Sequence, residues 1–236
     1  MSIAQAMILA AGRGERMRPL TDTCPKPLLK LKGKPLIEYH LDAFGRGGFR
    51  DVVVNTAWLG EQIENHYGRE TSAGTRVVYS HEGKDFGGAL ETAGGIARAL
   101  PLLDDAFWLV AGDVFMPGFL FTRAAYDRFC AGGKLAHLLL VPNPAHNPKG
   151  DFGLAADGRA LNQAEVRYTY STVALLRHAL FQTLPAGNPG GLKVALAPLL
   201  RTAMDRGEVS AELYSGPWVD VGTPQRLQEL NAAAGL

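Results

Sequence analysis

The sequence predicts an α/β fold: a doubly wound, Rossmann-like sheet that is mixed but mostly parallel, with a small β-rich subregion. Three observations predict it. Apolar strand-like runs alternate with helical segments from Ala6 to Val141, an order typical of parallel sheets joined by helical crossovers. After Val141 the strand-like segments are shorter and less regular, which indicates antiparallel or edge strands. The 236 residues are 47% hydrophobic and 20% charged, as in ordinary soluble globular proteins.

The first half of the chain predicts strands and helices in strict alternation. The apolar run over residues 6–10 is expected to form a buried strand, and a loop rich in Gly and Pro follows over 11–34. Loops of this length are usually functional. A helix should begin near Pro35, because apolar residues recur after it at helical spacing. The further elements expected are a strand over 51–55, a helix over 58–67, a strand over 76–80, a Gly-rich turn, a helix over 91–100, a strand over 107–111, a helix over 119–130 and a strand over 135–141.

Shorter elements are expected in the rest of the chain. Thr223 and Pro224 are typical of a helix N-cap and first turn, so a last helix should begin there. Apolar spacing places Leu227, Leu230 and Ala234 on its inward face. No internal repeat or linker divides the sequence. The other elements expected are antiparallel or edge strands over 151–156, 160–162 and 171–176, an amphipathic helix over 196–203 and a short strand over 218–221.

Composition excludes several classes of protein. The net charge of +1 gives no reason to expect a nucleic-acid or membrane partner, and no obligatory protein partner is evident. Cys24 and Cys130 form neither a disulfide framework nor a zinc motif, so a cytoplasmic location is expected. The apolar run at 6–11 is too short to span a membrane and lacks the basic start of a signal peptide. The histidines show no metal-ligand spacing, and His40, His66 and His178 are expected on helix surfaces.

Positive charge is concentrated near the first strand. Residues 1–34 contain seven Lys or Arg against two Asp or Glu. A solvated basic face is the common outcome for such a run. Here the charges follow a strand end, where open α/β sheets bind ligands, which favours a pocket for a polyanion such as a nucleoside triphosphate.

The loop after the first strand is suited to phosphate. It lacks the third glycine of a dinucleotide fingerprint and the Gly-Lys-Ser/Thr of a P-loop. Its small residues, Gly12 and Gly14 among them, let a ligand approach backbone N–H groups. Arg16 offers a planar fork and Lys26 a point charge for phosphate oxygens.

These residues carry a resemblance to a known family. Leu-Ala-Ala-Gly-x-Gly-x-Arg-Met-x-Pro-Leu-Thr over 9–21, Pro-Lys-Pro-Leu over 25–28 and Gly-x-Pro-Leu-Ile over 33–37 resemble the signature of sugar-1-phosphate nucleotidyltransferases. Similar motifs recur over 90–95, 112–113, 143–144 with 151–152, and 218–223, so the resemblance covers nearly the whole chain. It implies one catalytic domain over 1–236, with a nucleotide-binding half over about 1–115 and a sugar-binding half over about 116–236. It also implies an enzyme that joins a nucleoside monophosphate from a triphosphate to a sugar 1-phosphate and releases pyrophosphate.

The resemblance assigns roles to residues that spacing alone leaves open. Asp113 and Asp220 could each be turn or cap residues, but both match the metal-binding aspartates of the family, which implies Mg²⁺ as cofactor. Arg16, Lys26 and Asp113 are the implied catalytic residues. The implied nucleotide-binding residues are Leu9, Ala10, Ala11, Gly12, Gly14, Glu82, Gly83 and Thr92. Candidates for the sugar phosphate are Asn143, Asp151, Phe152, Glu165, Tyr170, Ser171 and Lys193, of which each could equally be structural and Lys193 is the weakest.

The choice of substrates depends on smaller features. The chain length, the Leu-Glu-Thr-Ala-Gly-Gly motif over 90–95 and the Gly-Asp-Phe-Gly motif over 150–153 are most similar to the N-acetylmuramate-1-phosphate uridylyltransferases of cell-wall recycling, which favours UTP. Mannose-1-phosphate guanylyltransferases have a similar Thr-Ala-Gly motif and are the alternative. A catalytically silent nucleotide-sugar sensor and a choline-phosphate cytidylyltransferase are further alternatives. The turn over 84–89 is longer than is usual in such proteins, and a solvated turn carboxylate is an equal alternative for Glu82.

Overall fold

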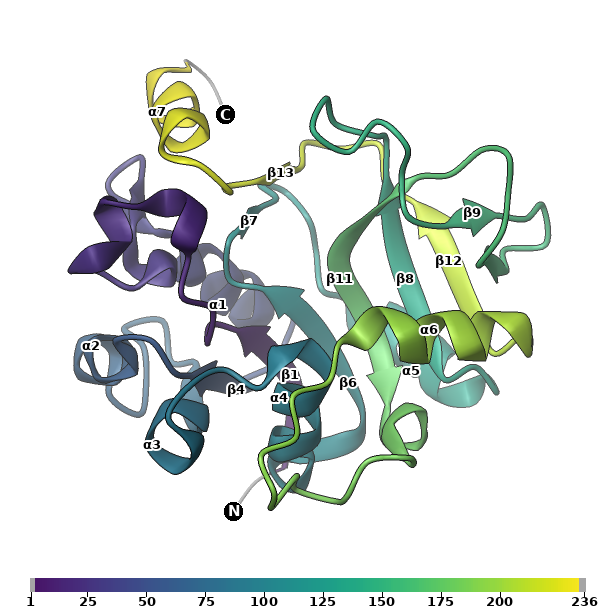
Figure 1. Ribbon diagram of the computed structural model, residues 1–236, viewed down its shortest axis with the longest axis horizontal. Coiled ribbons are helices and arrows are strands. Elements are labelled where there is room, and N and C mark those ends of the chain that lie inside the picture. Colours follow the sequence, from purple (N-terminus) through teal and green to yellow (C-terminus); the bar gives the residue numbers. More distant parts are fainter. Residues whose placement is uncertain (1–2, 234–236) are drawn as a thin grey trace.

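The computed structural model describes residues 3–233 and contains one large sheet with helices on both faces (Figure 1). The sheet has seven strands in the order β12-β8-β11-β6-β1-β4-β5. Four of its six pairings are parallel, and β11 runs antiparallel to both of its neighbours. The mostly parallel, doubly wound α/β sheet predicted from the sequence is therefore confirmed.

The first half of the chain supplies the parallel core of the sheet. Apolar side chains alternate between its two faces, as the period of a strand requires: Met7 packs on one face, and Ile8 on the other. The first face is covered by α4 and α6, and the second by α1, α2 and α5. The elements are β1 (Ala4–Leu9), α1 (Leu36–Arg46), β4 (Asp51–Thr56), α2 (Gly60–Tyr67), β5 (Arg76–His81), α3 (Glu82–Phe86), α4 (Glu91–Ala99), β6 (Leu103–Ala111), α5 (Arg123–Ala131) and β8 (Ala136–Val141).

The later strands depart from the expectation in two ways. The strand over 171–176, predicted to be antiparallel or at an edge, is β11 (Thr169–Arg177); it is antiparallel to both neighbours and lies inside the sheet between β6 and β8. The edge is instead β12 (Val209–Leu213), which the sequence did not predict because its polar Ser210 and Glu212 interrupt the apolar run. The other late elements are β9 (Gly153–Leu154), β10 (Ala160–Leu161), α6 (Leu196–Asp205), β13 (Val219–Asp220) and α7 (Pro224–Ala232).

The long loop over 11–34 is more ordered than expected. It contains 3₁₀ turns at Glu15–Met17, Leu20–Asp22 and Lys26–Leu28. A short hairpin closes it, formed by β2 (Lys30–Leu31) and β3 (Lys34–Pro35). The loop is thus a compact, hydrogen-bonded unit that can hold its basic side chains in fixed positions.

The C-terminal helix packs against this loop. A separate apolar cluster joins the two segments, and the side chain of Asn231 accepts from Lys32 N and donates to Lys30 O. Thr223 caps α7 by accepting from Arg226 N, as predicted, and Leu227 and Leu230 are buried; Ala234 lies outside the described residues. The cluster consists of Met17, Leu29, Leu31, Leu36, Phe115, Val221, Leu227 and Leu230.

One histidine expected on a surface is buried. His40 lies on the inner face of α1, and its Nε2 donates to Val114 O at 2.7 Å. His66 is exposed as expected, and His178 is half-buried. Across residues 3–233, no helix combines the length and the apolar character needed to cross a membrane.

Candidate active site

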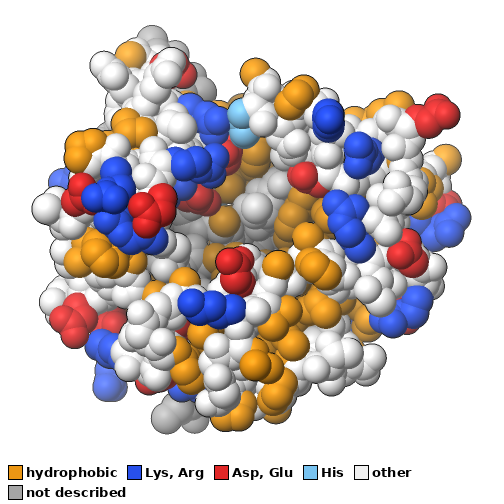
Figure 2. All heavy atoms as spheres, viewed as in Figure 1, with side chains coloured by type: hydrophobic (Ala, Val, Ile, Leu, Met, Phe, Trp, Pro, Cys, Tyr) orange, Lys and Arg blue, Asp and Glu red, His pale blue; other side chains and the backbone are white. Residues whose placement is uncertain are grey.

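A cavity of about 500 Å³ opens where β1, β4 and β6 end. Figure 2 shows this face of the molecule hollowed at its centre, with Lys and Arg side chains to the left of the hollow, below it and farther to its right. The cavity brings together ten of the residues singled out in the sequence: Leu9, Ala10, Ala11, Gly12, Gly14, Arg16, Lys26, Glu82, Thr92 and Asp113.

Glycine is required at two positions that shape this cavity. Gly14 has φ +69°, and a Cβ there would lie 3.0 Å from Thr21 Cγ2, while Thr21 Oγ1 donates to Gly14 O. Gly112 N donates to Leu9 O at 2.8 Å, and a Cβ on Gly112 would approach that oxygen to 3.0 Å. The second contact places Asp113, the next residue, directly beside the loop that follows β1.

The two predicted phosphate partners have different surroundings. Lys26 is 9% exposed, and its Nζ lies 2.5 Å from Asp113 Oδ2. Arg16 is exposed, and within residues 3–233 its guanidinium forms no ion pair or hydrogen bond. Lys26 is therefore fixed on the floor of the site beside an acidic partner, whereas Arg16 is available to an anionic ligand.

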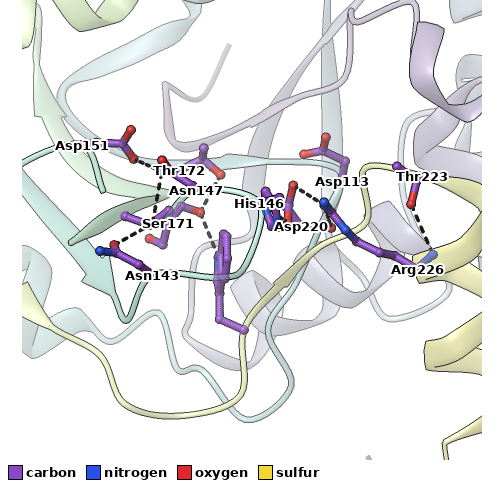
Figure 3. A network of polar contacts seen from close by, with 12 residues as sticks. Asp113, Asn143, His146, Asn147, Asp151, Ser171, Thr172, Asp220, Thr223 and Arg226 are labelled. Atoms are coloured by element: carbon purple, nitrogen blue, oxygen red, sulfur yellow. Dashed lines mark hydrogen bonds and ion pairs between the residues drawn. The ribbon is translucent and has the colours of Figure 1, made fainter. Parts of the chain in front are cut away.

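The short β7–β13 ladder brings the two predicted metal aspartates together. β7 (Val114–Phe115) pairs antiparallel with β13, Asp220 lies opposite Val114, and Val221 N donates to Asp113 O at 2.8 Å. Figure 3 shows the Asp113 and Asp220 side chains as neighbours. Asp220 Oδ2 accepts from Arg226 Nη1 at 2.8 Å, and Asp220 Oδ1 lies 3.0 Å from His146 Nε2.

This pair of carboxylates fits a magnesium ion that also binds substrate. Asp220 Oδ1 is buried and has no hydrogen bond of good geometry to any described residue. Its contact with His146 is short enough for an ion pair but lacks hydrogen-bond geometry. No cluster of three or more His, Cys, Asp or Glu suited to a metal occurs within residues 3–233. Two carboxylates completed by substrate phosphates and water are a usual environment for Mg²⁺, which seldom occupies an all-protein cage.

The end of the cavity that is predicted to receive the base is built around Glu82, which is fully buried. Its Oε1 accepts from Asn55 Nδ2 at 2.6 Å and its Oε2 from Leu90 N at 2.8 Å, while Asn55 Oδ1 accepts from Ala10 N at 2.7 Å. Burial raises the pKa of the Glu82 carboxyl, and these two hydrogen bonds oppose that shift. Glu82 thus links the ends of β1 and β4 to the start of α4, so its carboxylate is already engaged by the protein.

Gly83 lies on a second cavity of about 490 Å³, which adjoins the first at Ala11, Arg13 and Ala89. A Cβ on Gly83 would lie 2.7 Å from Ala57 O, so its lack of a side chain serves packing. Trp58 lines this second cavity, with the Arg13 guanidinium 3.9 Å from its ring centroid. Trp58 Nε1 also donates to Thr21 O, which ties the start of α2 to the loop over 11–34.

The predicted sugar-side residues form a network on the other side of the cleft (Figure 3). Asp151 Oδ2 accepts from Tyr170 N and Asn147 Nδ2. Asn143 Nδ2 donates to Arg167 O. These contacts hold the loop between β8 and β9 against β11, and they engage the polar groups that were expected to face a sugar.

The other sugar candidates are scattered. Phe152 is 2% exposed and belongs to the core, and Ser171 Oγ donates to Leu139 O within the sheet. The Tyr170 hydroxyl is buried without a partner among the described residues, and burial raises its pKa. Glu165 and Lys193 are exposed, and neither side chain forms a hydrogen bond or an ion pair with another described residue.

Four side chains at the site were not predicted: Asn55, Glu91, His146 and Arg226. Glu91 lines the first cavity with φ +62°, and Thr172 has φ +64° in a bulge of β11 across the cleft. A left-handed backbone is unusual for residues other than glycine and is often found at functional sites. The Glu91 carboxylate is exposed and has no partner within the described chain. The motif over 90–95 could have indicated Glu91, whereas nothing in the local sequence pointed to His146 or Arg226.

Comparison with known proteins extends this description. The model of the nucleotidyl transferase family matches residues 5–167. The chain is 47% identical over 237 residues to the N-acetylmuramate alpha-1-phosphate uridylyltransferase of Neisseria meningitidis serogroup B, covering 98% of each chain. It is 38% identical over 237 residues to the UTP–glucose-1-phosphate uridylyltransferase of Synechocystis, covering 92% of this chain and 60% of that one.

A solved structure shares the architecture. It is assigned as a glucose-1-phosphate thymidylyltransferase from Bacillus anthracis and superposes with a TM-score of 0.78 at 20% identity, covering 97% of this chain and 94% of that one. At this identity the likeness shows the fold alone. The sequence matches to the curated relatives extend far beyond the glycine-rich loop, through the sheet and the later half of the chain.

Proposed function

Because the chain belongs to the nucleotidyl transferase family, we propose that it transfers the uridylyl group of UTP to N-acetylmuramate 1-phosphate, with Mg²⁺ as cofactor. The products are UDP-N-acetylmuramate and pyrophosphate. The observation that carries the proposal is the Lys26–Asp113 pair, 2.5 Å apart beside the β7–β13 ladder that also holds Asp220. The full-length similarity to an N-acetylmuramate alpha-1-phosphate uridylyltransferase supports the choice of substrates.

The reaction forms one P–O bond and breaks another. An oxygen of the sugar phosphate attacks the α-phosphorus of UTP, and the bond between the α-phosphorus and the oxygen that leads to the β-phosphate breaks, so pyrophosphate leaves. A phosphate monoester, with its second pKa of about 6, is mostly a dianion at neutral pH, so the nucleophile needs no general base. The protein must therefore align the two phosphates and neutralise charge as the bonds exchange.

The described residues can supply both functions. Backbone N–H groups of the loop after β1 bind the triphosphate, and Arg16 stabilises the departing pyrophosphate. Lys26 neutralises oxygens of the reacting phosphoryl group from its fixed position beside Asp113. Asp113 and Asp220 would hold the Mg²⁺, which supplies positive charge at the α-phosphate when bound.

A guanylyltransferase acting on mannose 1-phosphate is the second candidate. The second cavity adjoins the base end of the first at Ala89, so the cleft offers room for a purine as well as for uracil.

We place the reaction in the cytoplasm, because Cys24 and Cys130 are both free thiols, as expected of a protein in a reducing compartment.

The test is pyrophosphate release measured with Mg²⁺ over a matrix of UTP and GTP against N-acetylmuramate 1-phosphate, glucose 1-phosphate and mannose 1-phosphate. We expect the highest kcat/KM for UTP with N-acetylmuramate 1-phosphate, by at least about tenfold, since one well-placed polar contact is worth about that factor. A preference for GTP with mannose 1-phosphate would establish the second candidate instead. Nucleotide binding without turnover of any pair would indicate a sensor.

A further inference from the structure

We propose that His146 binds the phosphoryl group of the sugar 1-phosphate. Before the metal and the substrate bind, Asp220 holds the imidazole in place. This inference rests on the proposed function and assigns a residue to it. His146 belongs to the later half of the chain, on the loop between β8 and β9. Its Nε2 lies 3.0 Å from Asp220 Oδ1, and the two side chains are 33% and 21% exposed.

The loop that carries His146 is held in place on both sides. Asn147 N donates to Pro144 O and Gly150 N donates to Asn147 O, which forms two consecutive turns, the first of which contains His146. The Asn147 side chain donates to Asp151 Oδ2 and to Thr169 Oγ1. The imidazole is therefore presented by a braced loop and reaches across the cleft to β13 (Figure 3).

Asp220 is arranged to release His146. Arg226 Nη1 already donates to Asp220 Oδ2 and to Asp220 O, so the carboxylate stays anchored when its other oxygen changes partner. That other oxygen, Oδ1, makes no well-directed hydrogen bond, because its contact with His146 has ion-pair distance without hydrogen-bond geometry. A divalent cation is a stronger partner for this oxygen than a poorly aligned imidazole, so the two compete for it.

The distances then place His146 beside the reacting groups. A Mg²⁺ ion lies about 2.0–2.1 Å from its carboxylate oxygens, so an ion on Asp220 Oδ1 would lie within roughly 5 Å of His146 Nε2. A phosphate oxygen of a substrate held there would come within hydrogen-bond reach of an N–H donor at this position. The imidazole donates one hydrogen bond to a non-bridging oxygen and transfers no proton, so the balance of the reaction is unchanged.

The direction of approach selects the sugar phosphate over the triphosphate. The triphosphate side of the site consists of Gly12, Gly14, Arg16 and Lys26, all from the first half and all on the walls of the first cavity. His146 comes from the opposite half and does not line that cavity. Because the nucleophile and the leaving group must lie roughly in line on opposite sides of the α-phosphorus, a donor that lies outside the triphosphate cavity, in the half that carries the predicted sugar-side residues, meets the incoming phosphate.

The test compares His146→Ala and His146→Gln with the matched control His66→Ala, an exposed histidine on α2. Steady-state kinetics should show kcat/KM for N-acetylmuramate 1-phosphate falling roughly 10- to 100-fold in His146→Ala, the usual range for a lost hydrogen bond to a charged group. KM for UTP should change by no more than about twofold, because the proposal assigns His146 to the sugar phosphate. A twofold change is well below the effect of losing one hydrogen bond. His146→Gln, which keeps an N–H donor, should recover part of the loss, and His66→Ala should match the wild type.

A second readout uses no substrate. Mn²⁺ binding to the protein alone, followed by electron paramagnetic resonance of the free ion, should be tighter in His146→Ala because the competitor for Asp220 Oδ1 is removed. Weaker Mn²⁺ binding, equal losses for both substrates, or unchanged kinetics would each overturn the inference. If the wild type itself fails to use N-acetylmuramate 1-phosphate, the proposed function fails. The kinetic comparison is then repeated with the sugar phosphate that the wild type does use, and the same criteria decide on His146.

Discussion

Glu91 and Thr172 adopt left-handed backbones on opposite sides of the cleft, although neither is glycine. Such a conformation costs an ordinary residue on the order of 1–2 kcal/mol. Neither side chain is needed to fill the core, since Glu91 is exposed and Thr172 is half-buried. We infer that the left-handed backbone at both positions lowers the stability of the fold and is kept because it shapes the site.

Glu91→Gly should raise the stability of the protein and lower its catalytic activity. Relief of the strained backbone, less the greater freedom of glycine in the unfolded chain, should raise the free energy of unfolding by on the order of 0.5–1 kcal/mol. Loss of the carboxylate from the cavity should raise KM for the nucleoside triphosphate. Urea unfolding and steady-state kinetics measure the two effects, with Thr172→Gly as a control for strain relief alone. A less stable Glu91→Gly protein would contradict the argument.

Lys26→Ala and Asp113→Asn should each lower kcat by about 10²–10³, equivalent to 2.7–4 kcal/mol, the usual cost of one preorganised charged partner at a transition state. Because Lys26 Nζ contacts Asp113 Oδ2, the double variant should lose less than the product of the two single losses. Pyrophosphorolysis of the nucleotide sugar is the assay. Lys30→Ala, an exposed lysine on the same loop, should be near normal, and near-normal activity of Lys26→Ala would refute its role.

His40 should make stability depend on pH below neutrality. Burial lowers the pKa of the imidazole from 6.5 to about 4. Between these values the unfolded chain binds a proton that the folded protein excludes, so stability falls as pH decreases from 6.5 to 4, by about 3 kcal/mol in total. Urea unfolding at intervals over this range should show the decrease. His40→Gln, which keeps a donor toward Val114 O and cannot titrate, should lose that part of the slope, and an unchanged slope would exclude His40 as its source.

At the scale of elements, α7 supports the phosphate loop from outside the sheet. Leu227 is 7% exposed and lies in the cluster that contains Met17, the residue after Arg16. Asn231 adds hydrogen bonds to the β2–β3 hairpin that follows Lys26. The position of the basic side chains therefore depends on a helix at the other end of the chain.

Leu227→Ala should lower the free energy of unfolding by about 2–3 kcal/mol, the lower part of the range for a truncated buried leucine. It should also raise KM for the triphosphate, because the loop that carries Arg16 loses its support. Thermal unfolding and steady-state kinetics check both effects. Leu213→Ala, on the edge strand and 43% exposed, is the matched control and should change neither by much. Lost stability with an unaltered KM would show that the helix holds up the fold without positioning the loop.

At the scale of the whole molecule, the sequence predicted what local patterns determine. Apolar runs located the buried strands of the first half, and the glycine-rich loop located one wall of the first cavity, with Arg16 and Lys26 on it. The interior position of β11 was not predictable, because strand order depends on long-range pairing. The edge strand β12 lacks a continuous apolar run, so its sequence does not indicate a strand. The packing of α1 buries His40, although histidine is not one of the residue types most often found buried.

The site shows the same limit. Asp113 and Asp220 could be assigned from the family resemblance, but their meeting across β7 and β13 required the fold. His146 and Arg226 were missed because they reach Asp220 from a turn and a helix surface with no distinctive pattern. Glu82 was proposed either to meet the base or to be a turn carboxylate, and the hydrogen bonds that it accepts from Asn55 and Leu90 depend on neighbouring strand ends that the sequence alone does not bring together.

The β7–β13 ladder has a consequence for the synthesis of the protein. Every strand of the large sheet precedes Val219 in the chain, whereas the second carboxylate and the helix that steadies the phosphate loop come after that point. A nascent or prematurely terminated polypeptide could assemble the sheet and still contain only Asp113 of the Asp113–Asp220 pair. A copy truncated just before Asp220 should therefore be inactive, although every strand of the large sheet is present in it.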